Sequence, residues 1–236
     1  MGKIIKKYDR SIIVACDVRT LKELENLVRQ TYDVEGIGGY KVGSTLVIRY
    51  GLPKVVKSIR KFTDMPIIYD HQKGMTDIPD LAEEFVSAVK NSDVDALIGF
   101  PLSGPLTEEK WIEACKKNNL EVIIGGEMTH PKYKKSEGGY VMDEALDEIY
   151  LLAAKKGVNN FVIPGTRIDR VLHYREILKF VPDLTFYVPG FVAQGGIVED
   201  ISKVAGSKWH AIVGRAIYAA KNIRLAAVEM CKQIAR

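Results

Sequence analysis

Three ionisable side chains follow one apolar run in the middle of the chain. The run is Ile67-Ile68-Tyr69, and Asp70, Lys73 and Asp77 come directly after it. With Lys41, which lies in the earlier short strand Gly39-Tyr40-Lys41-Val42, these groups form an array of alternating charge. Charge beside a buried strand is costly unless it is paired or used, and a lysine held by carboxylates can protonate a developing carbanion. A simpler interpretation is that Asp70 pairs with Lys73 and Asp77 caps the next helix.

A second set of residues has the pattern of a phosphate site. Gly195-Gly196 and Gly214-Arg215 each follow an apolar run near the end of the chain. Glycines let backbone N–H groups approach phosphate oxygens, and arginine can bind those oxygens through two parallel hydrogen bonds. We therefore expect this part of the chain to bind a phosphate group. The simpler alternative is that the glycines serve tight turns and that Arg215 lies on the surface.

Eight short apolar segments, each followed by a helical pattern, must position these residues. Their alternation with amphipathic helices predicts a parallel sheet. Eight such units in 236 residues predict one closed (β/α)8 barrel, and the alternative is an open doubly wound sheet. No linker divides the chain, so we expect a single domain over residues 1–236, in which residues 1–10 form a polar leader. The predicted strands are 12–16, 39–42, 67–70, 96–100, 122–124, 161–163, 185–188 and 211–213.

In a barrel of this kind, the residues that follow each strand gather on one rim, where active sites lie. Polar and ionisable side chains, with glycine, occupy those positions here. This clustering of residues that are far apart in sequence predicts an enzyme. The rim positions are Asp17, Lys41, Asp70, Lys73, Thr129, Gln194, Gly214 and Arg215.

The composition excludes several classes of protein. The net charge of +4 is too small and too dispersed to indicate nucleic-acid binding, although it suits a small anionic ligand. No apolar run approaches the roughly 18 residues of a membrane helix, and the first residues lack the apolar segment of a signal peptide. The three cysteines are far apart and indicate neither disulfides nor a zinc site. We expect a cytoplasmic protein.

Several longer motifs resemble those of orotidine 5'-phosphate decarboxylases, particularly the archaeal forms. They occur in the order typical of that family and span nearly the whole chain. The motifs are Ala15-Cys16-Asp17-Val18, Lys41-Val42-Gly43, Asp77-Ile78-Pro79, Glu127-Met128-Thr129-His130-Pro131, Pro164-Gly165-Thr166-Arg167, Pro189-Gly190, Ala193-Gln194-Gly195-Gly196 and Val213-Gly214-Arg215-Ala216-Ile217-Tyr218.

The resemblance implies decarboxylation of orotidine 5'-phosphate to UMP without a cofactor or a metal. Lys73 would protonate C6 of the pyrimidine, within a catalytic array that also contains Lys41, Asp70 and Asp77. The resemblance also implies a homodimer in which Asp77 and Ile78 reach the neighbouring site. The remaining substrate contacts that it implies are Asp17 to the ribose, Thr129 to the pyrimidine, and Gln194 with Arg215 to the phosphate. Pro189, Gly195 and Gly214 are expected as further substrate-binding residues.

The chain departs from the family pattern in three places. The family has Asp-x-Lys-x-x-Asp, whereas each gap between Asp70, Lys73 and Asp77 holds one residue more. Since side chains alternate along a strand, an extra residue would turn Lys73 away from Asp70 unless an irregular turn absorbs it. We expect such a turn at His71-Gln72. Leu81 and Ile98 stand where the family usually has threonine and histidine.

Two other functions are compatible with these residues. One is a metal-dependent lyase of the same superfamily that acts on a ketose phosphate, with a cation held by Asp17, Asp70 and Glu127. Against it, Lys41 stands where such enzymes carry a glutamate ligand, and its charge would repel Mg²⁺. The other is a non-catalytic phosphosugar-binding barrel, which would have little use for the charged array.

Overall fold

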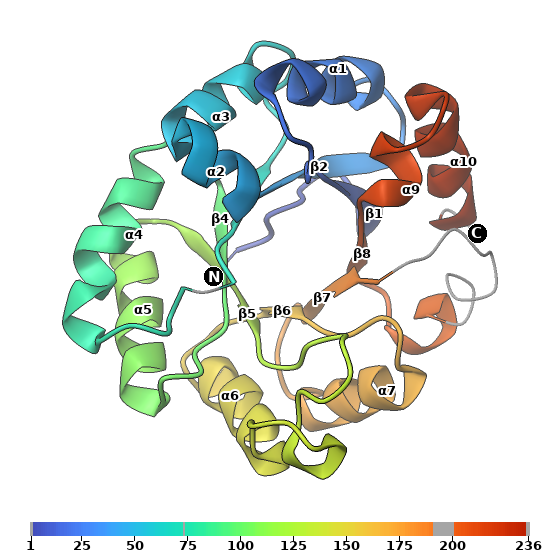
Figure 1. Ribbon diagram of the computed structural model, residues 1–236. Coiled ribbons are helices and arrows are strands. Elements are labelled where there is room, and N and C mark those ends of the chain that lie inside the picture. The colour runs from blue at the N-terminus through green and yellow to red at the C-terminus, as the bar shows by residue number, and fades with distance from the viewer. Residues whose placement is uncertain (1, 73, 191–200, 235–236) are drawn as a thin grey trace.

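Eight parallel strands close into a barrel in the computed structural model, which describes residues 2–72, 74–190 and 201–234. Each strand pairs with its neighbours in sequence, and β8 pairs with β1, so the predicted (β/α)8 barrel is confirmed (Figure 1). The strands are β1 (Arg10–Ala15), β2 (Ile37–Gly43), β3 (Ile67–Asp70), β4 (Ala96–Gly99), β5 (Glu121–Gly125), β6 (Asn160–Val162), β7 (Thr185–Pro189) and β8 (Trp209–Val213).

Helices cover the outside of the barrel (Figure 1). The helical pattern expected between β2 and β3 forms two helices, because the chain turns at Gly51, whose φ is 79°. The helices are α1 (Leu21–Thr31), α2 (Ser44–Tyr50), α3 (Leu52–Arg60), α4 (Ala82–Lys90), α5 (Pro105–Lys117), α6 (Asp143–Lys155), α7 (Ile168–Ile177), α9 (Arg215–Tyr218) and α10 (Ile223–Ile234), with short 3-10 helices η1 (Pro79–Leu81) and η2 (Lys135–Glu137) and a helical stretch at 201–204. None of the helices described is long and apolar enough to cross a membrane.

The strands separate two apolar cores, because neighbouring side chains in a strand point to opposite faces. In β3, Ile67 and Tyr69 belong to the large layer between barrel and helices, whereas Ile68 belongs to the smaller cluster inside the barrel. The alternation therefore directs Asp70, at the end of β3, to the inner face. Both faces are buried, which explains why the strands read as continuous apolar runs.

The segment before β1 closes the end of the barrel opposite the rim. It was expected to be a polar leader, but Ile4 and Ile5 are buried in the cluster inside the barrel. Gly2 lies near the start of β5, where its N–H donates to the carboxylate of Glu121 at 2.8 Å. Apolar side chains inside the barrel need a cover at this end, and the two isoleucines supply it, so only part of the leader is polar.

Candidate active site

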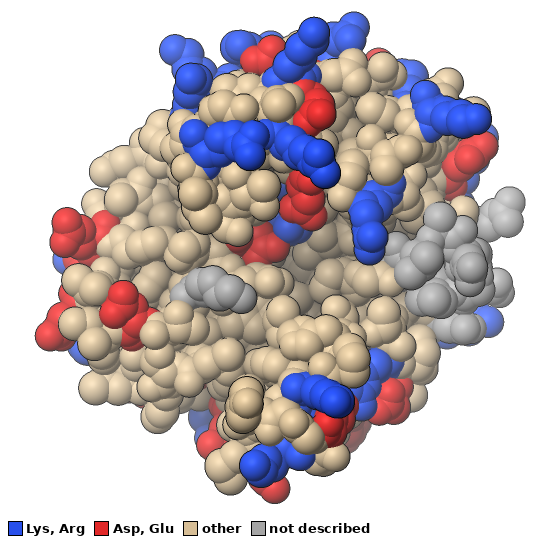
Figure 2. All heavy atoms as spheres, in the orientation of Figure 1, with Lys and Arg blue, Asp and Glu red and all other residues tan. Residues whose placement is uncertain are grey.

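The carboxyl ends of the strands surround a cavity of about 1160 Å³. Figure 2 shows it as a hollow at the centre of this face, with acidic and basic side chains close together along one side. Among the residues described, its lining consists of Ala15, Asp17, Lys41, Gly43, Ser44, Thr45, Ile48, Tyr69, Asp70, His71, Gln72, Ile98, Val162, Pro189, Gly190, Ile212, Gly214, Arg215, Ala216 and Tyr218. Six of the expected site residues are in this set, namely Asp17, Lys41, Asp70, Pro189, Gly214 and Arg215.

Lys41 lies between two carboxylates in the cavity. Its Nζ is 2.7 Å from Oδ2 of Asp70 and 3.5 Å from Oδ1 of Asp17. Burial lowers the pKa of Lys41, but the charges of Asp70 and Asp17 outweigh burial, so the pKa lies above its ordinary value of 10.5. The ammonium group is therefore charged at neutral pH and holds both carboxylates close to it. Asp70 pairs with this lysine, and Oδ1 of Asp70 has no hydrogen-bond partner among the described groups.

The register of the barrel explains why Lys41 points into the cavity. Lys41 pairs with Ala15 of β1 and with Ile68 of β3, and both neighbours face the barrel interior. Gly43, at the end of β2, lies beside the ion pairs. A Cβ at this position would lie 3.2 Å from Oδ1 of Asp17 and 3.9 Å from Nζ of Lys41, so a larger residue would crowd the pair.

The strand ends on the other side of the cavity carry the expected phosphate residues. Gly214 follows β8, and the exposed Arg215 begins α9. At the end of β7, Gly190 has a φ of 99°, a conformation that favours glycine. Gln194 and Gly195, which were also expected here, lie outside the described residues.

The connection between β3 and α4 holds the other members of the expected array. β3 ends at Asp70, and a turn follows in which the N–H of Gly74 donates to the carbonyl of His71 at 2.7 Å. An irregular turn at this point was expected from the spacing. Asp77 and Ile78 are exposed and do not line the cavity of their own chain. Lys73 lies outside the described residues.

Thr129 is exposed beside the cavity rather than in its lining. Its Cγ2 lies 3.8 Å from the point where Gly190 would carry a Cβ. Glu127, two residues earlier, is fully buried, and its Oε2 accepts hydrogen bonds from Arg170 and Tyr174, both at 2.6 Å. Glu127 therefore does not join Asp17 and Asp70 in a cation site. Within the described parts of the chain, no group of three or more His, Cys, Asp or Glu side chains could hold a metal ion.

Several lining residues are not among the expected site residues, although His71 and Gln72 were considered as further polar candidates, His71 as an exposed or supporting residue rather than a catalytic one. Ser44 and Thr45 begin α2 directly after β2, while His71 and Gln72 directly follow β3. Their position directly after a strand could have identified them as cavity residues. Polar side chains at such positions also occur as ordinary turn residues, however. Ile98, at the position where the family usually has histidine, contributes apolar surface to the cavity.

The fold and the cavity together define a class of protein, the (β/α)8-barrel enzymes that act at the carboxyl ends of their strands. Comparison with known proteins then identifies the family. Residues 10–230 match the model of the orotidine 5'-phosphate decarboxylase / HUMPS family, and the chain belongs to that family. Two similar proteins are orotidine 5'-phosphate decarboxylases of Methanosarcina mazei (31% identity) and Methanosarcina barkeri (32% identity), each over 94% of this chain and 94% of the relative.

Solved structures give the same result. The orotidine 5'-monophosphate decarboxylase of Methanocaldococcus jannaschii, complexed with the inhibitor BMP, superimposes with a TM-score of 0.83 at 27% identity. That match covers 96% of this chain and 99% of the other. The orotidine 5'-phosphate decarboxylase of Pyrococcus horikoshii superimposes with a TM-score of 0.80 at 27% identity, over 95% of this chain and 99% of the other.

Proposed function

We propose that this protein decarboxylates orotidine 5'-phosphate to UMP without a cofactor or a metal. The observation that carries the proposal is the buried Lys41 ammonium between Asp17 and Asp70, at the carboxyl ends of the strands of a decarboxylase-family barrel. A barrel that only bound a phosphosugar would have no use for a buried charged lysine there. The names of the similar proteins support the same reaction.

In the proposed reaction, the bond between C6 and the carboxylate breaks and its electron pair stays on C6. Carbon dioxide leaves, and Lys73 supplies the proton that forms the new C6–H bond. Lys41 and Asp70 keep their charges through the step. Their charged groups stay at fixed positions near the reacting carbon. Groups oriented in advance need no rearrangement as charge develops, which makes them more effective than water.

Residues on the rim of the barrel bind the rest of the substrate. Gly214 and Arg215, with Gln194 and Gly195, bind the phosphate. Asp17 binds the ribose hydroxyls, Thr129 binds the pyrimidine, and Pro189 is a further substrate-binding residue. The location of Gly214, Arg215 and Pro189 in the cavity lining supports this assignment. Binding energy from the phosphate, which is remote from C6, is then available to lower the barrier at the reacting carbon.

The assembly that we propose is a homodimer in the cytoplasm. Asp77 and Ile78 would complete the neighbouring subunit's site, since both are exposed and lie outside the cavity of their own chain. An apolar surface on η1 and around the start of α5 supports a contact at this place. Its exposed residues are Ile78, Leu81, Leu102 and Leu106. The three cysteines are free and buried, which suits a reducing compartment.

The direct test is to add orotidine 5'-phosphate to the purified protein and to follow the loss of its ultraviolet absorbance. We expect turnover that is unchanged in EDTA and unchanged by added Mg²⁺. Activity that disappears in EDTA and returns with Mg²⁺ would instead support the metal-dependent lyase. Tight binding of the substrate without turnover would support the non-catalytic barrel.

A further inference from the structure

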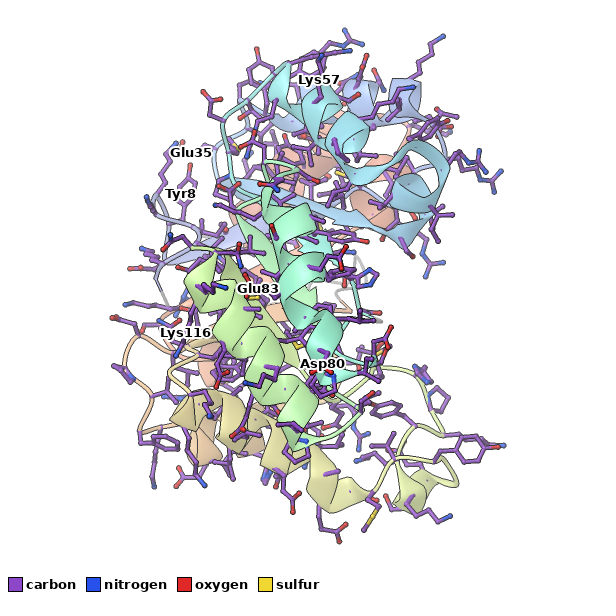
Figure 3. The ribbon with its side chains drawn as sticks, turned by 90° about the vertical axis from the view of Figure 1, so that its left-hand side faces the viewer. Tyr8, Glu35, Lys57, Asp80, Glu83 and Lys116 are labelled. Carbon is purple, nitrogen blue, oxygen red and sulfur yellow. The ribbon has the colours of Figure 1, made fainter. Side chains whose placement is uncertain are left out.

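The β3–α4 connection is the part of the rim where the chain is longer than the family pattern. It leads from Asp70 in the cavity to the exposed Asp77. Helices α4 and α5 lie beside each other, and in Figure 3 the labelled Asp80 of η1 lies toward the rim, away from Tyr8 and Glu35 at the opposite end. A longer connection loses more conformational entropy when it is ordered. Side chains that hold it in one conformation therefore help to keep the site in place.

A row of aromatic rings joins this connection to the two helices. The hydroxyl of Tyr69 and Nδ1 of His71 are 2.8 Å apart, within hydrogen-bonding distance. The His71 ring packs against the ring of Phe85 of α4 at a tilt of 33°, with centroids 4.7 Å apart, and the centroid of Phe85 is 4.8 Å from that of Trp111 of α5. Burial lowers the pKa of His71 and raises that of Tyr69 to about 12, so both groups are neutral at pH 7.

The backbone of the connection packs against the ring of His71. The N–H of His71 donates to the carbonyl of Tyr69 at 3.2 Å, and the N–H of Gly74 donates to the carbonyl of His71 at 2.7 Å. A Cβ on Gly74 would lie 2.8 Å from Cδ2 of His71, so only glycine allows the turn to pack this closely on the imidazole. Because its ring and its carbonyl both contact other parts of the turn, His71 is the common point of these interactions.

The far side of the turn is fixed to β4 and α5. The N–H of Phe100 donates to the carbonyl of Gly74 at 3.3 Å, and the hydroxyl of Thr107 donates to the carbonyl of Asp77 at 3.2 Å. Met75 is buried in a left-handed conformation, with φ of 67°, and its side chain packs against Gly99. A left-handed backbone at a residue other than glycine persists only where its surroundings hold it in place.

We propose that His71 is a positioning residue for the decarboxylation. Its ring, bound by Tyr69 and packed against Phe85, fixes the turn that absorbs the added length between Asp70 and Asp77. Asp70 thereby keeps its contact with Lys41, and the start of the connection keeps its place at the cavity wall, where His71 and Gln72 both lie. This inference rests on the proposed function.

Kinetics of three variants test the role. His71→Phe keeps a ring for packing but loses the nitrogen, and Tyr69→Phe removes the same hydrogen bond from its other end. We expect each to lower kcat by roughly threefold to tenfold, with KM within about twofold of the wild type, because a single neutral hydrogen bond is lost. The double variant should lose no more than either single variant, because both remove one interaction. His173→Phe, a matched substitution on α7 at a histidine bound to Asp147, should leave kcat unchanged.

Hydrogen exchange tests the same inference without activity. In His71→Ala, which loses the ring altogether, we expect the Gly74 and Phe100 amides to exchange faster, while α10 exchanges as in the wild type. Unchanged exchange at Gly74, or additive losses in the double variant, would overturn the inference. Failure of the wild type to consume orotidine 5'-phosphate would contradict the proposed function alone, since the exchange result would still decide whether His71 holds the turn.

Discussion

At the scale of single residues, the cavity is built on one buried cation shared by two anions. Nζ of Lys41 contacts Asp70 at 2.7 Å and Asp17 at 3.5 Å, so either carboxylate alone leaves the lysine only partly compensated. Removing one member of a buried ion pair costs more than the pair itself contributes, because the other charge stays buried. The Asp70 and Lys41 side chains, which are both buried, therefore act as a unit, and substitutions of these two residues are not expected to be additive.

Arg215→Ala should affect the phosphorylated substrate selectively. We expect kcat/KM for orotidine 5'-phosphate to fall by roughly 10- to 100-fold, as for loss of a hydrogen bond to a charged group. The phosphate-free nucleoside, orotidine, should be converted at the rate of the wild type. Arg49→Ala is the matched control, since Arg49 is an exposed arginine on α2 outside the cavity lining. Equal losses for the two substrates would remove Arg215 from the phosphate site.

Glu108→Gln should change how stability depends on pH. Glu108 on α5 is buried and its Oε1 has no hydrogen-bond partner among the described groups. Burial raises its pKa from 4.5 to about 8, so the folded protein holds a proton there that the unfolded chain releases above pH 4.5. The free energy of unfolding of the wild type should therefore decrease between pH 4.5 and 8, by up to about 1.4 kcal/mol per pH unit from this group.

Urea denaturation across that pH range measures the effect. The glutamine side chain introduced by the substitution does not titrate, so the stability of Glu108→Gln relative to the wild type should increase toward pH 8. Glu113→Gln, at an exposed position of the same helix, is the control and should follow the wild type. Parallel curves for the wild type and Glu108→Gln would show that Glu108 is ionised in the folded state.

The sequence predicted Lys41 and Asp70 because each lies near the carboxyl end of a buried strand, where charge is costly without a use. It did not predict that Lys41 would also lie close to Asp17. Asp70 pairs with Lys41 from the adjacent strand at 2.7 Å, and an interaction of Asp70 with Lys73 stays a prediction. Pairing across strands depends on their register, and the apolar pattern within one strand does not determine the register of its neighbours.

At the scale of elements, the β5–α6 connection that carries Thr129 is held by one buried carboxylate. Glu127 binds Arg170 and Tyr174 of α7, and Lys134 of the connection itself lies 3.4 Å from its Oε1. We expect Glu127→Ala to lower the free energy of unfolding by roughly 3 to 5 kcal/mol, since Arg170 would lose its buried partner.

Chemical denaturation gives the measurement, with Glu148→Ala as the control at an exposed position of α6. The control should change stability by less than about 0.5 kcal/mol. Equal midpoints for the two variants would show that the network around Glu127 contributes nothing to stability.

The regular elements were predictable because strands and helices differ in the period of their apolar residues. The helical pattern after β2 was interpreted as one helix, because the spacing of its apolar residues does not reveal the turn at Gly51. The course of the β3–α4 connection was predictable only as an irregular turn. Its position depends on contacts with Phe85 and Phe100, which lie on other elements, and no local pattern records such contacts.

At the scale of the whole molecule, the proposed dimer shares its sites between subunits. Lys41→Ala and Asp77→Ala should each abolish turnover, the first in its own subunit's site and the second in the partner's. When the two inactive variants are unfolded together and refolded as a mixture, about half of the dimers are mixed, and each mixed dimer has one intact site. We expect about a quarter of wild-type activity to return.

Sedimentation of the mixture should confirm that dimers have formed. The matched control is a mixture of Lys41→Ala with Asp70→Ala, which should stay inactive because both changes fall in the same subunit's site. No recovery in the first mixture would mean that Asp77 acts within its own chain.

The burial of Ile4 and Ile5 inside the barrel affects the order in which the protein can be completed during its synthesis. Ile4 and Ile5 are synthesised well before Tyr187 and Ile212, which belong to the same cluster. Likewise, β1 cannot pair with β8 until β8 has been synthesised. This segment therefore reaches its native contacts late, and until then it exposes two isoleucines and an open strand edge to chaperones that bind the nascent chain.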